Sequence, residues 1–209
     1  MIVYLVRHGL SKANVARLVT GTPADGLVDE GRRQADALGG WLRGAGVVPD
    51  RYLVSHWGRA RQTADLLYPG APWVVDERLG ETDAGSAADM SLESFLESWP
   101  DFYGSNLNCY PAGESHQNLH ERVANAWADI RRSDANVVLA VTHSGPISCL
   151  LQQMLGVGMD RFPAFLPSHA SVSILESRVP SGSGNPSFRL RGFSAGPVPF
   201  VPTSAAALR

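Results

Sequence analysis

Residues 1–9 read Met-Ile-Val-Tyr-Leu-Val-Arg-His-Gly, an apolar run that ends in two side chains able to carry positive charge and a glycine. The apolar part, residues 1–6, does not alternate with polar residues, which indicates a strand buried on both faces. Strands of that kind belong to parallel sheets that helices cover on both sides. Arg7 and His8 therefore follow the end of a buried strand.

The rest of the chain alternates further apolar runs with amphipathic segments, and no internal repeat or linker divides it. Further strands are predicted at 52–54, 73–75, 137–141, 171–176 and 188–193, and helices at 30–43, 59–67, 114–132 and 146–155. This order predicts an α/β fold, a three-layer α/β/α sandwich with a mainly parallel central sheet, in a single domain of residues 1–193. Residues 83–112 are predicted to form a small helical lid insertion, and residues 194–209 a flexible C-terminal tail.

Composition and charge narrow the classes of function. Of 209 residues 44% are hydrophobic, and Lys+Arg 18 against Asp+Glu 20 gives a formal net charge of −2. No overall positive field draws the chain to nucleic acid or to an anionic membrane, and no apolar run is long enough to span a bilayer. Two cysteines are too few for a disulfide framework, and no signal peptide opens the chain, so a cytoplasmic location is expected.

Arg and His side chains follow three of the predicted strands at the point where each strand ends. Arg7 and His8 follow the first strand, Arg59 lies just after the second, and His143 follows the central strand. Because ligands of open parallel sheets gather outside the carboxyl ends of the strands, these side chains are expected to share one site. Arg forks match phosphate oxygens and helix N-termini favour anions, so the set predicts a phosphate site.

Six short motifs follow one another in a fixed order along the chain. They are Leu-Val-Arg-His-Gly-Leu-Ser-Lys-Ala-Asn (5–14), Asp-Glu-Gly-Arg-Arg-Gln-Ala (29–35), Ser-His-Trp-Gly-Arg-Ala-Arg-Gln-Thr-Ala (55–64), Leu-Gly-Glu (79–81), Gly-Glu-Ser (113–115) and Val-Thr-His-Ser-Gly (141–145). The set resembles the histidine phosphatase superfamily, also called phosphoglycerate-mutase-like, over residues 1–176. The resemblance implies a metal-independent phosphomonoester hydrolase that acts on a small phosphorylated metabolite and uses no cofactor.

The resemblance also implies roles for single residues. His8 matches the nucleophile that becomes a phosphohistidine, a task that suits imidazole because its neutral form exists near neutral pH. Arg7, Arg59 and His143 match positions around the transferred phosphoryl group, where catalysis is mostly positioning and electrostatic stabilisation. These four residues are the expected catalytic set, together with one carboxylic acid.

The acid and the substrate contacts are less sharply defined by the motifs. Glu81 matches the proton donor by its place after Leu-Gly, but Asp83 is close by and offers a second carboxylate. Asn14, Ser11 and Gly21 match positions of the phosphate pocket and its loop and are expected to bind substrate. Asn14 has an alternative interpretation as a helix-capping residue.

Three other functions compete with a phosphatase. A phosphoglycerate-mutase-type phosphotransferase needs cations for a second anionic group, and residues 84–110 contain neither Arg nor Lys. A catalytically inactive, phosphate-binding member would have no need of Arg7, His8, Arg59 and His143 together. Metal-dependent hydrolysis through His116 and His120 lacks a third ligand, and exposed helical histidines are the simpler interpretation of that pair.

The segment 83–112 carries the expectation about substrate. It contains acidic side chains together with aromatic and aliphatic ones: Asp89, Glu93, Phe95, Leu96, Glu97, Trp99, Asp101, Phe102 and Tyr103. A lid of this composition favours a phosphomonoester whose organic part is neutral, apolar or cationic. The sequence leaves the oligomeric state open, with a homodimer among the alternatives.

Overall fold

The computed structural model describes residues 1–178 and 187–197, which form a mixed α/β fold around one sheet. Residues 179–186, between the last two predicted strands, and the part of the predicted tail beyond residue 197 lie outside the described residues. The strands are β1 (Ile2–Arg7), β2 (Arg51–Val54), β3 (Val74–Val75), β4 (Val137–Thr142), β5 (Val172–Arg178) and β6 (Ser187–Ala195).

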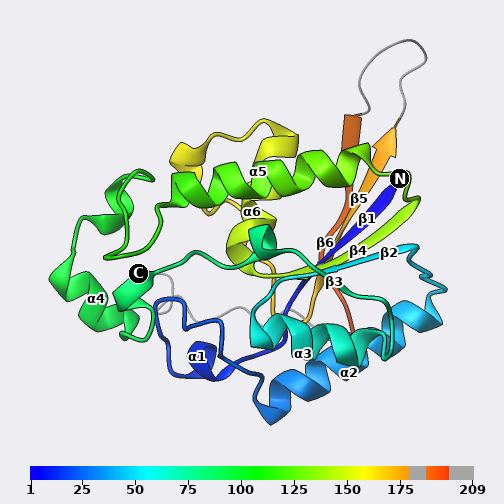
Figure 1. The fold of residues 1–209 in the computed structure, drawn as a ribbon, viewed down its shortest axis with the longest axis horizontal. Coiled ribbons are helices and arrows are strands. Elements are labelled where there is room, and N and C mark those ends of the chain that lie inside the picture. Colours follow the sequence, from blue (N-terminus) through cyan, green and yellow to red (C-terminus); the bar gives the residue numbers. More distant parts are fainter. Residues whose placement is uncertain (179–186, 198–209) are drawn as a thin grey trace.

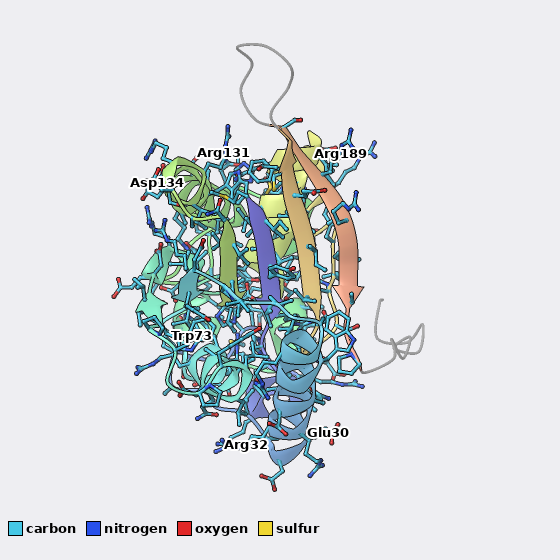
Figure 2. The ribbon with its side chains drawn as sticks, turned by 90° about the vertical axis from the view of Figure 1, so that its right-hand side faces the viewer. Glu30, Arg32, Trp73, Arg131, Asp134 and Arg189 are labelled. Atoms are coloured by element: carbon cyan, nitrogen blue, oxygen red, sulfur yellow. The ribbon has the colours of Figure 1, made fainter. Side chains whose placement is uncertain are left out.

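The sheet is six-stranded, in the order β3-β2-β4-β1-β5-β6. The strands from β3 to β1 pair in parallel, and β5 and β6 join the edge beside β1 in antiparallel fashion. The prediction of a mainly parallel sheet is therefore confirmed. The unbroken apolar runs of β1 and β4 lie at its centre, as expected for strands covered on both faces. Trp73 and Arg189 mark opposite edges of the sheet in Figure 2.

Helices cover both faces of the sheet, which gives the predicted three layers. Helices α2 (Asp29–Gly44) and α3 (Gly58–Leu67) pack on one face, and α5 (His116–Arg132) and α6 (Ser144–Leu155) on the other (Figure 1). Within β1, Leu5 belongs to the core beneath α5 and α6, while Val6 belongs to the core against α2 and α3. Burial of each such side chain stabilises the fold by roughly 1.5–3 kcal/mol.

The segment 83–112 forms a smaller unit beyond the carboxyl ends of the parallel strands. It contains α4 (Leu92–Ser98) and the short turns η2 (Gly85–Ala87) and η3 (Phe102–Gly104), and it lies on the same side of the molecule as α1 (Lys12–Val15) in Figure 1. Its own apolar cluster is Ala84, Ala87, Ala88, Phe95, Phe102 and Tyr110. The segment is thus a packed structure rather than an open loop.

Several element boundaries differ from the predicted ones by a few residues, for local reasons. Helix α5 begins at His116 because the Ser115 hydroxyl accepts from the Asn118 N–H as an N-cap. Helix α6 begins at Ser144, so Pro146 lies in its first turn, where a missing N–H costs nothing. Strand β6 continues to Ala195, so the first two residues of the predicted tail belong to a strand. No helix among residues 1–178 and 187–197 is long and apolar enough to cross a bilayer.

Candidate active site

A cavity of about 260 Å³ opens at the carboxyl ends of the parallel strands. Arg7 and His8 reach it from the end of β1, Arg59 from the first turn of α3, and Glu81 from the loop after η1 (Glu77–Leu79). The full lining is Arg7, His8, Asn14, Leu18, Val19, Thr20, Arg59, Glu81, Thr82, Tyr103, Tyr110, His116, Ser144, Gly145, Phe162, Pro163 and Leu166. The structure therefore brings together most of the residues that the sequence singled out.

His8 is held in one tautomer by its own backbone. Its Nδ1–H donates to the Gly9 carbonyl oxygen at 2.7 Å, so the lone pair lies on Nε2. Nε2 is buried and has no hydrogen-bond partner among the described residues. Burial, and then the positive charge of Arg59, hold the pKa of His8 well below its ordinary value. The ring is neutral near pH 7, with a free nucleophilic nitrogen.

Arg7 contributes a cation whose hydrogen-bonding capacity is only partly used. One Nη donates to the Pro167 carbonyl oxygen at 2.7 Å, while the enclosed Nε has no partner among the described residues. Burial lowers the pKa of Arg7 to about 10, and the guanidinium therefore stays charged at neutral pH. A charged group buried with an unmatched N–H is costly unless an anion completes it, which is the property of an anion-binding site.

Arg59 and His143 form a second, fully buried pair. The Arg59 Nε–H donates to His143 Nδ1 at 3.2 Å, and an Arg59 Nη forms an ion pair of 3.0 Å with Asp25. Because His143 Nδ1 accepts, its Nε2–H donates to the Ser55 Oγ at 2.9 Å. The rings of His143 and His8 lie edge to face with centroids 4.9 Å apart. Burial and the charge of Arg59 keep the pKa of His143 well below its ordinary value.

Glu81 lies where helix α6 begins. Its carboxylate is 3.4 Å from both the Gly145 N–H nitrogen and the Ser144 Oγ, next to the positive end of the helix. A Cβ at Gly145 would come within 2.3 Å of a Glu81 carboxylate oxygen, so the glycine makes room for the acid. Asp83 is exposed, accepts from the Gly85 N–H and does not line the cavity. Of the two candidate acids, Glu81 has the placement for proton transfer.

Arg122 on α5 holds the loop that carries Glu81, and no sequence pattern pointed to it. Its guanidinium donates to the carbonyl oxygens of Arg78, Gly80 and Glu81 at 2.7–2.9 Å. It also forms an ion pair of 2.6 Å with Glu114, the Glu of the Gly-Glu-Ser motif. Arg122 therefore connects that motif to the backbone of Glu81, which accounts for two of the motifs being spatially close.

The predicted substrate residues take different positions. Asn14 lines the cavity, and its Oδ1 also accepts from the Ser11 N–H at 3.2 Å. Ser11 is buried, does not line the cavity and caps α1 through a hydrogen bond from the Asn14 N–H to its Oγ. Gly21, with φ of +71°, lies behind Arg59 in the loop whose Thr20 carbonyl accepts from that arginine. Asn14 thus has both predicted positions: it takes part in the cap of α1, and it lines the cavity.

A further histidine lies next to His8. His169 has its ring centroid 5.8 Å from that of His8, and its enclosed Nε2 has no partner among the described residues. Burial lowers the pKa of His169 to about 3. His169 ends the stretch Leu-Pro-Ser-His (166–169), which belongs to no helix or strand, so hydrophobic periodicity does not mark it.

The expectation that His116 is an exposed helical histidine is wrong. His116 is 7% exposed and lines the cavity, because α5 begins against the 83–112 segment. His120 is half-buried and contacts Gln153. Within residues 1–178 and 187–197, no group of three or more His, Cys, Asp or Glu side chains is arranged to hold a metal ion.

Comparison with known proteins assigns the class. A sequence profile described as Histidine phosphatase superfamily (branch 1) matches residues 3–181. The chain belongs to this superfamily. It is 31% identical over 166 residues to 6-phosphofructo-2-kinase/fructose-2,6-bisphosphatase 1 of Rattus norvegicus, a match that covers 77% of this chain and 34% of that protein. The chain thus spans about a third of the length of the curated relatives it matches.

Solved structures support the fold over nearly the whole chain. A mycobacterial glucosyl-3-phosphoglycerate phosphatase is similar with a TM-score of 0.80 and 24% identity, covering 93% of this chain and 99% of that one. The alpha-ribazole phosphatase of Shigella flexneri has a TM-score of 0.82 and 23% identity, covering 93% and 96%. Both similar structures, like the curated relative, carry a phosphatase activity in their names.

The contacts of Arg122 yield a prediction for stability. Arg122→Met would leave the carbonyl oxygens of the Glu81 loop and the Glu114 carboxylate without their donor, so the free energy of unfolding should fall by roughly 3 kcal/mol. Arg131→Met, on the exposed end of the same helix, should change it by less than about 0.5 kcal/mol. Urea denaturation of both variants measures the difference, and equal, small effects would show that Arg122 does not hold the loop.

The depressed pKa of His169 predicts how stability depends on pH. Its pKa is about 3 in the folded protein and about 6.5 in the unfolded chain. Between these values the unfolded state binds more protons, so the free energy of unfolding falls as the pH falls. A histidine that stays neutral in the folded protein therefore lowers the free energy of unfolding by roughly 2 kcal/mol when the pH falls from 7 to 5. In urea denaturation at both pH values, the free energy of unfolding of His169→Gln should fall by about 2 kcal/mol less than that of the wild type. An identical fall in both proteins would contradict the lowered pKa of His169.

Proposed function

We propose that the protein is a metal-independent phosphomonoester hydrolase that forms a phosphohistidine on His8. One observation carries the proposal: the lone pair of His8 Nε2 and the Nε–H of Arg7 are both buried and unpartnered at one cavity. A phosphoryl group satisfies both at once, since its phosphorus accepts the lone pair and its oxygens accept the N–H. Membership of the histidine phosphatase superfamily supports the same reaction class.

In the first step, His8 Nε2 attacks the phosphorus and the bond from phosphorus to the ester oxygen breaks. The charge that spreads over the phosphoryl oxygens is stabilised by Arg7 and Arg59. Both cations are in place before substrate arrives, because Asp25 and the Thr20 carbonyl hold Arg59 and the Pro167 carbonyl holds Arg7. Glu81 gives its proton to the departing oxygen, and an alcohol leaves.

In the second step, a water molecule attacks the phosphorus of the phosphohistidine. Glu81, now ionised, takes a proton from this water, the bond from Nε2 to phosphorus breaks, and inorganic phosphate is released. Neutral His8 is restored with its proton still on Nδ1. The hydrogen bond from Nδ1 to the Gly9 carbonyl supports both steps, since it aligns the ring and stabilises the positive charge that imidazole gains as it bonds to phosphorus.

Hydrolysis is favoured over a mutase-type phosphotransfer by the cations of the cavity. Arg7 and Arg59 are the only Lys or Arg side chains in the described lining, and both belong to the phosphoryl end. A bisphosphorylated cofactor would leave its second phosphate without a partner.

The proposal includes a cytoplasmic location, which the exposed free thiol of Cys109 supports.

The proposal predicts that His8→Ala abolishes metal-free activity. Purified protein should hydrolyse p-nitrophenyl phosphate in excess chelator, and His8→Ala should lower kcat/KM by at least about a thousandfold because no nucleophile remains. His120→Ala is the matched control: it removes a helical histidine outside the cavity and should keep full activity. Loss of activity in chelator, or in His120→Ala, would support the metal-dependent alternative instead.

A second prediction concerns the general acid. Glu81→Gln cannot protonate the leaving oxygen, so it should reduce kcat on an alkyl phosphate by about 100-fold or more. The reduction on p-nitrophenyl phosphate should be far smaller, because p-nitrophenolate leaves without a proton. Asp83→Asn should affect neither substrate. Equal losses on both substrates in Glu81→Gln, or a leaving-group-dependent loss in Asp83→Asn, would reject Glu81 as the acid.

A further inference from the structure

The cavity has a second end that the phosphoryl chemistry does not use. Besides the arginines, its wall includes aromatic and aliphatic side chains from three separate segments: Tyr103, Tyr110, His116, Phe162, Pro163 and Leu166. The tyrosines come from the 83–112 segment, His116 from the start of α5, and the others from the loop after α6. We call these six residues the aromatic end of the cavity.

The rings of the aromatic end are fixed against one another. His116 lies nearly parallel to Tyr103, with an interplanar angle of 15° and centroids 5.8 Å apart, and its centroid is 4.8 Å from that of Phe162. The hydroxyl oxygens of Tyr103 and Tyr110 are 3.1 Å apart and hydrogen-bond to each other. Such a wall loses little freedom when a flat group packs on it, and offset or edge-to-face contacts are the arrangements that aromatic rings favour.

The aromatic end carries no charge that would select an ionic group. Burial lowers the pKa of His116, so its ring is neutral near pH 7. Burial also raises the pKa of Tyr103 and of Tyr110, which keeps both hydroxyls protonated. The carboxylates that favoured a cationic substrate in the sequence do not contact the cavity: Asp89, Glu93, Glu97 and Asp101 are all exposed and absent from its lining.

Size sets a further limit on the substrate. The cavity holds about 260 Å³, at or below the lower end of the roughly 300–1,000 Å³ of typical ligand pockets. A cavity of roughly 150 Å³ accommodates one benzene-sized ring. The remaining space suits one phosphoryl group bound by Arg7 and His8. A second ring or a second phosphate would have to lie outside.

We infer that the physiological substrate is a small monophosphate ester whose alcohol carries one flat, uncharged, largely apolar ring. The ring packs on Tyr103, His116 and Phe162 while the phosphoryl group contacts Arg7 and His8. This inference rests on the proposed phosphatase function and names the substrate class of the same site. It excludes bisphosphates, although the curated relatives carry a fructose-2,6-bisphosphatase in their names.

The test compares phosphate esters of primary alcohols that differ only in what the alcohol carries. Benzyl phosphate should have a kcat/KM roughly tenfold or more above those of ethyl phosphate, phosphocholine and 3-phosphoglycerate, through aromatic contact. Fructose 2,6-bisphosphate should be poorer still. Best turnover of the bisphosphate, the carboxylate or the quaternary ammonium compound would overturn the inference while leaving the phosphatase proposal intact.

Variants locate the ring and separate the two claims. Tyr103→Ala should raise the KM for benzyl phosphate roughly tenfold with much less effect on ethyl phosphate, whereas Tyr103→Phe should keep the wild-type preference. Trp99→Ala is the matched control, because it truncates an aromatic side chain of the same segment that does not line the cavity. An equal effect of Tyr103→Ala on both esters would contradict the assigned contact.

A binding measurement covers the case in which the enzyme proposal itself fails. Benzylphosphonate has a P–C bond and is not hydrolysed, so its affinity can be measured by calorimetry whether or not the protein is active. It should bind at least roughly tenfold more tightly than methylphosphonate, and Tyr103→Ala should remove that difference. Equal affinities of the two phosphonates would overturn the inference independently of any activity.

Discussion

The parallel pairing of β1 with β4 is the interaction on which the site depends. Its register sets Arg7 opposite Thr142, and the His8 N–H continues the ladder to the Thr142 carbonyl at 3.0 Å. Both strands therefore end at the same level, and the residue that follows each is a histidine, His8 and His143. A shift of one residue would turn every side chain of β1 to the other face. The two apolar cores that fix the register thereby also fix the distance between the two imidazoles.

The same edge of the sheet concentrates buried polar groups that the protein does not satisfy by itself. Arg7 Nε, His8 Nε2 and His169 Nε2 are enclosed and unpartnered among the described residues. Each such group costs free energy in the folded state. The cost is tolerated because continuous apolar burial on both faces of the sheet offsets it. In the proposed reaction, a bound phosphoryl group would also supply the partners that Arg7 and His8 lack. Histidines kept neutral by burial also lower the free energy of unfolding at acidic pH, because the unfolded chain binds protons there that the folded chain does not.

Some of this arrangement could be predicted from sequence and some could not. The four expected catalytic residues lie at strand ends or at a helix start, namely Arg7, His8, Arg59 and His143. The rule that ligands gather at the carboxyl ends of the strands is therefore enough to predict that they share one site. Asp25, Arg122 and His169 act through contacts between distant segments, and nothing in their neighbourhood marks them. The prediction that His116 is exposed is wrong because helical periodicity does not show what packs on the first turn of α5. The acidic residues of the 83–112 segment do not face the substrate cavity, although their number favours a cationic substrate in the sequence. Composition alone cannot distinguish the face toward the cavity from the face toward solvent.

The two ends of the cavity are built by different kinds of segment. Its phosphoryl end is built by sheet edges and helix starts, which are rigid because the cores require them. Its aromatic end is built by the 83–112 segment and the loop after α6, which meet at Asn106. The side-chain amide nitrogen of Asn106 donates to the Met159 carbonyl, and its backbone carbonyl accepts from the Gln117 N–H of α5. Changes in these two segments leave the strand register untouched. Substrate preference can therefore vary on this fold without disturbing the catalytic groups, and for that reason the site's reaction class and its choice of alcohol call for separate evidence.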